Sequence, residues 1–201
     1  MKKIGLFFGT FNPVHNGHLE LAQFFLSNSD ISDIYFIVTP LNPFKINSEI
    51  VDNEYRLEMV KIATTGKKNF YPSDIEFDIP PPNYTIKTIL KIIKESPDTK
   101  FSILIGEDNL SSFNKWKDYK SILENVELYV YPRKKKYSVP ETLKNHPRII
   151  NFKAPLINFS STQIRNRIRE NKEIKRLVPI KVYSYIRKRK IYLRHWNSPK
   201  Y

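Results

Sequence analysis

Short apolar runs recur along the chain, separated by polar stretches or by stretches with helical spacing. Each run is bounded by polar or turn-forming residues, a pattern typical of a buried strand. The strands predicted in this way cover residues 3–8, 34–39, 101–105 and 126–131, with a weaker candidate at 148–152.

Helical spacing is clearest in residues 84–94, where apolar residues recur at three- and four-residue intervals and predict one buried face. That face would consist of Ile86, Ile89, Leu90 and Ile93. Similar spacing predicts helices at 19–26 and 55–63, the second with Asp52 as its N-cap. Because strands and helices alternate, the pattern predicts an α/β protein with a doubly wound parallel sheet.

Residues 78–84 interrupt this alternation with three consecutive prolines. Proline disrupts a helix interior and cannot donate a ladder hydrogen bond in a central strand. The segment therefore predicts a rigid loop that leads into the helix near Tyr84.

The C-terminal part of the chain predicts helices that pack on the same core. Apolar residues at 164, 168, 182 and 186 need a partner surface, and no Gly/Ser linker or internal repeat divides the chain. We therefore expect a single domain over residues 1–201, with a helical C-terminal section at 160–190 and a basic tail at 191–201.

Composition restricts the partners and the compartment. The chain has 34 Lys and Arg against 20 Asp and Glu, a formal charge of +14, which favours either nucleic acid or a small phosphorylated substrate. The basic runs at 132–137 and 186–201 are expected to be mostly solvated surface. Absence of cysteine excludes disulfides and thiolate metal sites and fits a cytoplasmic protein. The apolar runs are too short for a membrane span or a secretory signal.

The stretch GTFNPVHNGHLELA, residues 9–22, contains two of the five glycines and two of the four histidines. It follows a predicted strand and opens a helix near Asn16, so free backbone N–H groups and the positive end of the helix dipole predict an anion site. His15 and His18 are three residues apart and can face one ligand. Gly17 would allow a nucleotide to approach the backbone closely. Neither a P-loop nor a dinucleotide-binding glycine motif is present.

A second anion site is predicted in FSSTQIRNRIRE, residues 159–170. Ser160 and Gln163 have the spacing of a capping box, which marks a helix start. Ser161 and Thr162 would offer hydroxyl and N–H groups there, and Arg165 is close enough to bind a phosphate through two N–H groups. The alternative is a simple N-cap followed by a solvated basic helix.

A third candidate lies in ILIGEDNLSSFNKW, residues 103–116. Ligands of open α/β sheets bind beyond the carboxyl ends of the strands, so Gly106 and Asp108 are well placed to contact a ribose or nucleotide. Trp116 is equally compatible with a core position and with stacking on a heteroaromatic ring.

Together these segments resemble the nicotinate-nucleotide adenylyltransferases of the HxGH nucleotidyltransferase superfamily. The resemblance covers nearly the whole chain, and HxGH by itself indicates only the superfamily. The segments that carry it, in order, are GTFNPVHNGHL, NPFK at 42–45, PNYTIKTI at 82–89, GEDNLSSFNKW at 106–116, SSTQIR at 160–165 and LVPIKVYSYI at 177–186. Phe8 and Phe44 depart from the family pattern, which often has a glycine and a histidine there.

The resemblance implies a Rossmann-like nucleotidyltransferase fold and transfer of the adenylyl group of ATP to nicotinate mononucleotide. It implies catalytic roles for His15, His18, Lys45 and Arg165. ATP would contact Gly9, Thr10, Phe11, His15, Gly17, His18, Gly106, Asp108, Ser161, Thr162 and Arg165. Nicotinate mononucleotide would contact Thr10, Lys45, Tyr84, Thr85 and Trp116. Mg²⁺ is expected as a cofactor bound mainly through substrate phosphates, with no protein metal site.

Two other functions remain open at this point. A sibling such as a phosphopantetheine adenylyltransferase would share HxGH and the C-terminal serine motif, but it would not explain Thr85 and Trp116 in their settings. A basic nucleic-acid-binding module fits the charge, although no recognisable motif of that class is present. The oligomeric state is not predicted.

Overall fold

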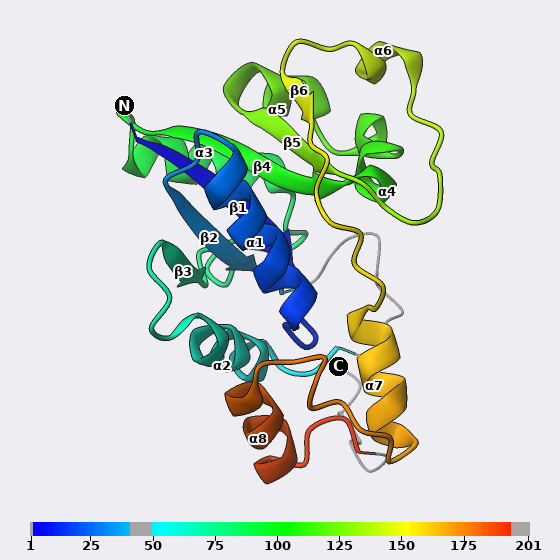
Figure 1. Cartoon of the computed structure of the whole chain (residues 1–201). Helices are drawn as coiled ribbons and strands as arrows, with labels where there is room; N and C mark the ends of the chain where they lie inside the picture. The colour runs from blue at the N-terminus through cyan, green and yellow to red at the C-terminus, as the bar shows by residue number, and fades with distance from the viewer. Residues whose placement is uncertain (1, 41–49, 194–201) are drawn as a thin grey trace.

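The computed structural model describes residues 2–40 and 50–193, whose strands form one parallel six-stranded sheet in the order β3-β2-β1-β4-β5-β6 (Figure 1). The strands are β1 (Lys3–Gly9), β2 (Asp33–Val38), β3 (Phe70–Ser73), β4 (Lys100–Gly106), β5 (Glu127–Tyr131) and β6 (Ile149–Asn151). The predicted doubly wound α/β fold is confirmed. The sequence did not predict β3, because this four-residue edge strand contains Pro72 and exposes Tyr71.

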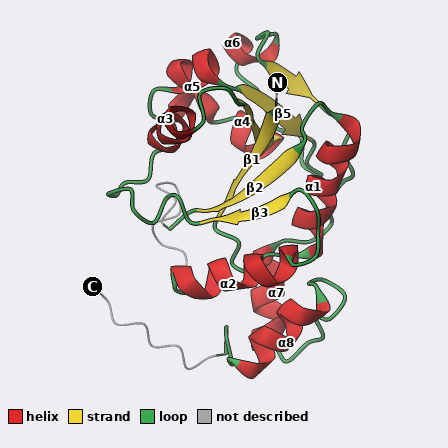
Figure 2. Cartoon of the chain, turned by 90° about the vertical axis from the view of Figure 1, so that its left-hand side faces the viewer, coloured by secondary structure: helices red, strands yellow, loops and turns green. Residues whose placement is uncertain are grey.

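Helices cover both faces of the sheet (Figure 2). One face packs against α1 (Asn16–Asn28), and the other packs against α3 (Thr85–Glu95) and α5 (Tyr119–Asn125). The remaining helical elements are α2 (Asn53–Thr64), α4 (Glu107–Leu110), a 3₁₀ turn η1 (Phe113–Lys115), α6 (Glu141–Lys144), α7 (Ser161–Arg169) and α8 (Ile180–Lys188).

Neighbouring residues of the central strands face opposite layers, which explains why these strands read as continuous apolar runs. In β1, Phe7 belongs to the core under α1, whereas Leu6 belongs to the core under α3 and α5. In β4, Leu104 and Ile103 divide in the same way.

The sheet has a topological switch point at β1, because the chain continues from β1 to β2 on one side and reaches β4 on the other. Leu6 is in register with Tyr35 of β2 and with Ile103 of β4. The carboxyl ends of β1, β4 and β5 therefore lie at one edge, which is where ligands of such sheets bind.

The helix α3 begins at Thr85, one residue after the predicted start, and residues 78–84 form no helix or strand. Its buried face differs from the prediction, because Leu90 is 50% exposed while Thr88 is fully buried. The Thr88 hydroxyl donates to the carboxylate of Glu76 at 2.7 Å, so a polar contact replaces the expected apolar one.

Of the two predicted helix caps, one forms its capping hydrogen bonds and the other does not. Ser160 and Gln163 form the expected capping box, with the Gln163 N–H donating to Ser160 Oγ at 3.3 Å and the Ser160 N–H donating to Gln163 Oε1 at 2.9 Å. Asp52 occupies the N-cap position of α2, but its side chain makes no capping hydrogen bond to that helix.

The C-terminal helices pack on the α1 side of the core, and Figure 1 shows α8 below α2 and α7 to the right of it. Their apolar residues Ile164, Ile168, Val182 and Ile186 are all buried, as the sequence predicts. The single-domain boundary stays a prediction. Within the described residues, no helix is long and apolar enough to cross a membrane.

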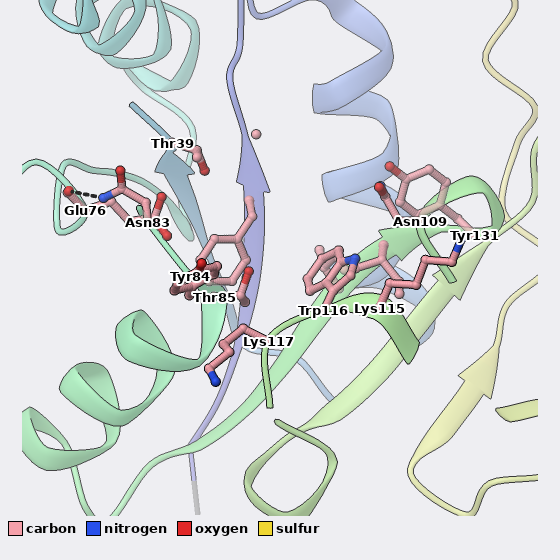
Figure 3. A pocket seen from close by; sticks show the side chains of 14 residues that line it. Thr39, Glu76, Asn83, Tyr84, Thr85, Asn109, Lys115, Trp116, Lys117 and Tyr131 are labelled. Carbon is pink, nitrogen blue, oxygen red and sulfur yellow. Dashed lines mark hydrogen bonds between the residues drawn. The ribbon is translucent and has the colours of Figure 1, made fainter. Parts of the chain in front are cut away.

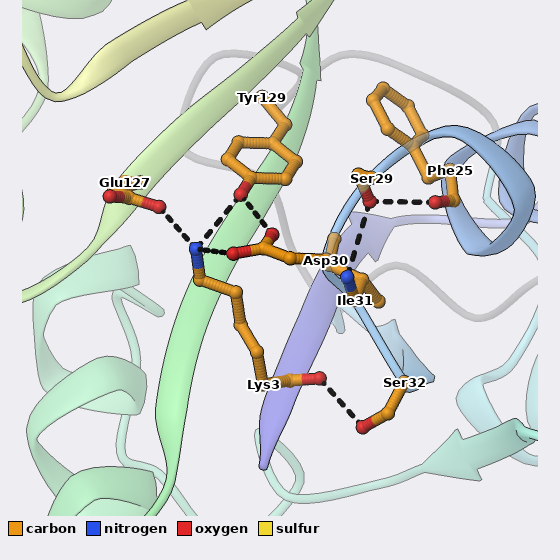
Figure 4. A network of polar contacts seen from close by, with 8 residues as sticks. All are labelled: Lys3, Phe25, Ser29, Asp30, Ile31, Ser32, Glu127 and Tyr129. Carbon is orange, nitrogen blue, oxygen red and sulfur yellow. Dashed lines mark hydrogen bonds and ion pairs between the residues drawn. The ribbon is translucent and has the colours of Figure 1, made fainter. Parts of the chain in front are cut away.

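A polar network ties β1 to β5 at the amino-terminal end of the sheet, away from the switch point (Figure 4). The Lys3 ammonium donates to Asp30 at 2.7 Å, Glu127 at 2.6 Å and the Tyr129 hydroxyl at 2.9 Å. Although burial alone lowers the pKa of Lys3, its hydrogen bonds to Asp30 and Glu127 raise that pKa above its usual value overall.

Candidate functional site

Two cavities open at the carboxyl ends of β1, β4 and β5. The α3 cavity, of about 270 Å³, includes Thr85 of α3 and Trp116 in its lining. The α7 cavity, of about 580 Å³, includes His18 of α1 and Ser161 of α7 in its lining. The two cavities share a wall that consists of Phe8, Gly9, Asn109 and Tyr131.

Most of the residues that the sequence predicts for ATP line the α7 cavity. They are Gly9, Thr10, Phe11, His15, His18, Asp108, Ser161, Thr162 and Arg165. Gly17 and Gly106 do not line it. Lys45 and Phe44 lie outside the described residues.

The start of α1 holds the two histidines against each other. His15 is the N-cap, and its ring stacks on that of His18 with centroids 3.6 Å apart. The His15 backbone N–H donates to His18 Nδ1 at 3.2 Å, which leaves Nε2 as the other polar atom of the His18 ring. Burial, with a smaller contribution from the charge of Arg133, lowers the pKa of His15 to about 3, so His15 is neutral at physiological pH.

The turn after β1 is tight because Phe11 adopts a left-handed backbone conformation, with φ of 44°. Its side chain is 2% exposed and packs between Phe7 and Phe36. A Cβ atom at Gly9 would lie 2.9 Å from the Phe11 ring, so any side chain at that position would force the buried ring to move. The turn therefore buries Phe11 in the core while Thr10 lines the α7 cavity.

Gly17 and Gly106 also serve packing, while their contact with a nucleotide stays a prediction. A Cβ at Gly17 would lie 2.4 Å from the Ile157 side chain. A Cβ at Gly106 would lie 2.3 Å from Asp108 Oδ1 and 2.6 Å from Arg133 Nε. Protein side chains thus occupy the position that a Cβ would take at each of the two glycines.

The start of α7 docks directly on the turn between β1 and α1. Ser161 Oγ donates to the Pro13 carbonyl at 2.9 Å, and Arg165 Nη1 donates to the Asn12 carbonyl at 2.8 Å. Arg165 Nε is buried and has no hydrogen-bond partner among the described residues. Burial also lowers the pKa of Arg165. The two predicted anion sites therefore line one cationic cavity.

Arg133 is a cavity residue that the sequence argument missed, because it belongs to a basic run expected to be solvated. It lies 4.9 Å from the Tyr131 ring centre, and its Nε donates to Asp108 Oδ1 at 2.8 Å. Its position two residues after the end of β5 is the signal that was available, since β5 ends at the ligand-binding edge. Lys134 and Lys135 line the same cavity.

Arg56 is a second residue that the sequence did not predict, and it holds in place the backbone segments next to the site. Its guanidinium is fully buried and donates to the carbonyls of Thr10, Thr39, Pro40 and Val51 and to the side chain of Asn53. Arg56 thereby joins the turn after β1 to the end of β2. A lone Arg in a helix gives no sequence signal for such a role.

The α3 cavity contains Tyr84, Thr85 and Trp116, the three residues expected around the nicotinate ring (Figure 3). Trp116 is half-buried and packs on Phe113 with ring centres 5.2 Å apart, so it serves the core and the cavity together. Lys115 and Lys117 flank it and line the same cavity.

Two further residues fix the start of α3 beside this cavity. Asn83 Nδ2 donates to the carbonyls of Glu76 at 2.9 Å and Ile79 at 3.2 Å. Glu76 is 1% exposed, and burial raises the pKa of its carboxyl despite the hydrogen bond from Thr88. The Lys87 N–H of α3 donates to the Tyr84 carbonyl at 2.9 Å, whereas the N–H groups of Thr85 and Ile86 have no carbonyl of the helix to donate to. The cavity can therefore accept an anionic group.

Within the described residues, no group of three or more His, Cys, Asp and Glu side chains is arranged to hold a metal ion. Asp108, the carboxylate that lines the α7 cavity, pairs with Arg133. The described lining of that cavity carries four cationic side chains, Arg133, Lys134, Lys135 and Arg165. Such a lining is suited to a polyphosphate.

The cytidylyltransferase-like family matches residues 6–167 of the chain. A curated relative from Christiangramia forsetii, named probable nicotinate-nucleotide adenylyltransferase, is 48% identical over 92% of this chain and 95% of its own length. A relative of the same name from Flavobacterium psychrophilum is 45% identical over 92% of this chain and 95% of its own length.

Solved structures share the fold. The nicotinic acid mononucleotide adenylyltransferase of Plasmodium falciparum, solved in complex with NaAD, superposes with a TM-score of 0.76 over 96% of this chain and 98% of its own. Its sequence identity of 17% makes this a likeness of fold alone.

Proposed function

The chain belongs to the nicotinate-nucleotide adenylyltransferases, within the cytidylyltransferase-like family, and we propose that its α7 cavity binds ATP while its α3 cavity binds nicotinate mononucleotide. The enzyme transfers the adenylyl group of ATP to nicotinate mononucleotide, giving nicotinate adenine dinucleotide and pyrophosphate, a step of NAD biosynthesis. The observation that supports this assignment of the two cavities is their shared wall, because ligands bound on its two sides can meet at one point.

The reaction needs no nucleophile from the protein. An oxygen of the mononucleotide 5′-phosphate attacks the α-phosphorus of ATP, and the bond from that phosphorus to the oxygen bridging the β-phosphate breaks. The leaving group is pyrophosphate, which carries away the electron pair. Catalysis then consists of holding the phosphates in line and stabilising the negative charge that develops on them.

The α1 and α7 starts provide that stabilisation in our proposal. His18 Nε2, with Nδ1 held by the His15 N–H, donates to the phosphate oxygens that gain charge in the transition state. The neutral His15 stacks on His18 and fixes the plane of its ring. Arg165 binds the departing pyrophosphate, and Ser161 and Thr162 bind the triphosphate. Lys45 is assigned to the pyrophosphate by the family resemblance alone.

The missed residue Arg133 also belongs to the ATP side. Asp108 fixes the guanidinium through Nε at 2.8 Å and Nη2 at 3.4 Å, and we assign Nη1 to the phosphate contact. Asp108 is proposed to contact the adenosine side as well, through the carboxylate oxygen that is less engaged by Arg133.

Mg²⁺ fits this cavity as an ion carried by the phosphates. The cationic lining offers the ion little beyond the Asp108 carboxylate, so phosphate oxygens and water would supply most of its ligands. When bound, the ion would neutralise part of the triphosphate charge.

The start of α3 supports selection of the acid form of the pyridine ring. Thr85 and the first N–H groups of α3 are donors, and a carboxylate there also interacts favourably with the helix dipole. A carboxamide would turn its own NH₂ toward these donors. Trp116 offers a face for stacking of the ring.

The test is pyrophosphate release from ATP with separate acceptors. We expect release with nicotinate mononucleotide and only background release with phosphopantetheine. Release with phosphopantetheine alone would replace the proposal by the sibling transferase. We also propose a cytoplasmic location, where the donor ATP is available.

A further inference from the structure

The wall between the two cavities is where the acceptor phosphate must meet the α-phosphate of ATP, if the proposed function holds. Phe8, Gly9, Asn109 and Tyr131 line both cavities. A bond forms only where the two ligands touch, so the acceptor 5′-phosphate belongs beside this wall. A phosphate monoester is close to a dianion at neutral pH and requires a cation or several donors when it leaves water.

Among the cationic side chains that line the two cavities, one on each side is already paired with a carboxylate. Arg133 contacts Asp108 at 2.8 Å, and Lys117 contacts Asp118 at 3.7 Å. Among the ion pairs formed within residues 2–40 and 50–193, none involves Lys115. Of the two lysines that line the α3 cavity, Lys115 is therefore the one that no carboxylate neutralises among the described residues.

The backbone of Lys115 is held firmly while its side chain faces the wall. Lys115 ends the 3₁₀ turn, its N–H donates to the Ser112 carbonyl at 3.0 Å, and Phe113 in the same turn is fully buried. In Figure 3 the Lys115 side chain extends toward Tyr131 and Asn109, whereas the Lys117 ammonium points away from them.

We propose that Lys115 binds the 5′-phosphate of the acceptor mononucleotide and positions it for attack on ATP. In this account the cations of the α7 cavity serve the triphosphate and Lys117 is paired with Asp118, so Lys115 is the cation that the described lining offers to the acceptor phosphate. Lys45, which the resemblance also places near the mononucleotide, lies outside the described residues. A flexible lysine suits this role, because its ammonium can follow the phosphate as it changes from a monoester to part of a diphosphate.

Lys115→Gln tests the assignment, with Lys115→Arg as the charge-preserving variant and Lys120→Gln as the matched control. Lys120 is an exposed lysine on α5. We expect Lys115→Gln to raise KM for nicotinate mononucleotide at least about tenfold, the effect of losing one charged hydrogen bond, with less than about a twofold change in KM for ATP. Lys115→Arg should recover most of the loss, and Lys120→Gln should match the wild type.

A binding measurement separates the phosphate from the rest of the acceptor. Wild type should bind nicotinate mononucleotide more tightly than its dephosphorylated riboside. In Lys115→Gln the ratio of Kd for the riboside to Kd for the mononucleotide should fall about tenfold, with Kd for the riboside unchanged. Equal weakening for both ligands, or an unchanged KM in a wild-type-like enzyme, would overturn the role of Lys115 alone. Failure of the wild type to use nicotinate mononucleotide at all would overturn the proposed function and this inference together.

Discussion

Replacement of Arg56 by methionine tests how the site is supported. The buried guanidinium donates to four backbone carbonyls, those of Thr10, Thr39, Pro40 and Val51. Burial lowers the pKa of Arg56 to about 10, so the group stays charged at neutral pH and its hydrogen bonds are charge-assisted. Methionine fills similar space but leaves all four acceptors without this donor.

The expected magnitude follows from those four acceptors. At about 1 kcal/mol for each orphaned carbonyl, the free energy of unfolding should fall by about 4 kcal/mol. This lies within the range of about 3–5 kcal/mol observed when one partner of a buried charged contact is removed. Urea denaturation followed by circular dichroism measures the change. Arg56→Lys should lose less, because the ammonium retains up to three donors.

Arg148→Met is the matched control, since Arg148 is exposed and the chemical change is the same. It should alter the free energy of unfolding by no more than about 0.5 kcal/mol. A loss below about 1 kcal/mol in Arg56→Met, or equal losses in the two variants, would refute the supporting role of Arg56.

The other predictions concern the α7 cavity. His18→Ala should lower kcat about 100-fold or more with an unchanged circular dichroism spectrum, because one transition-state contact is lost; an unchanged kcat would remove His18 from the mechanism. Arg165→Ala should raise KM for ATP about tenfold or more, and normal ATP kinetics would limit the start of α7 to a structural role. The unfolded His15 imidazole gains a proton near pH 6.5 but the folded one only near 3, so stability is lost as pH falls through that window. Between pH 6.5 and 3 the free energy of unfolding of the wild type should therefore fall by up to about 1.4 kcal/mol per pH unit relative to that of His15→Gln. The same pH dependence of that free energy in both proteins would contradict this.

The central strands could be predicted because their burial is visible in short segments of the sequence. Buried parallel strands are apolar on both faces, so β1, β2, β4 and β5 stand out as continuous runs. The edge strand β3 lacked that signal, since Tyr71 is exposed and Pro72 donates no ladder hydrogen bond. Leu90 was wrongly predicted to be buried, because helical spacing assigns the buried face to apolar residues. Thr88 is buried instead, because its hydroxyl donates to the Glu76 carboxylate, a contact that spacing cannot indicate.

The candidate site could be predicted where a motif marked it, at the starts of α1 and α7. The docking of Arg165 on Asn12 joins residues 153 positions apart, a contact that spacing within one segment cannot indicate. Arg133 and Arg56 were missed for the same reason, since their partners come from other elements. The packing of Gly17 against the Ile157 side chain was missed as well, because Ile157 lies in a distant segment of the chain.

The choice between the acid and the amide of the pyridine ring tests the central claim most directly. Steady-state kcat/KM should be measured with nicotinate and nicotinamide mononucleotides at saturating ATP, in wild type and in Trp116→Ala. Mispairing of a carboxamide with the donors at the start of α3 costs about 1–3 kcal/mol per group, so the account predicts at least about a tenfold preference for the acid. Trp116→Ala should raise KM for the mononucleotide more than for ATP. Equal kcat/KM for the two mononucleotides, or a preference for the amide, would contradict the account of the α3 cavity.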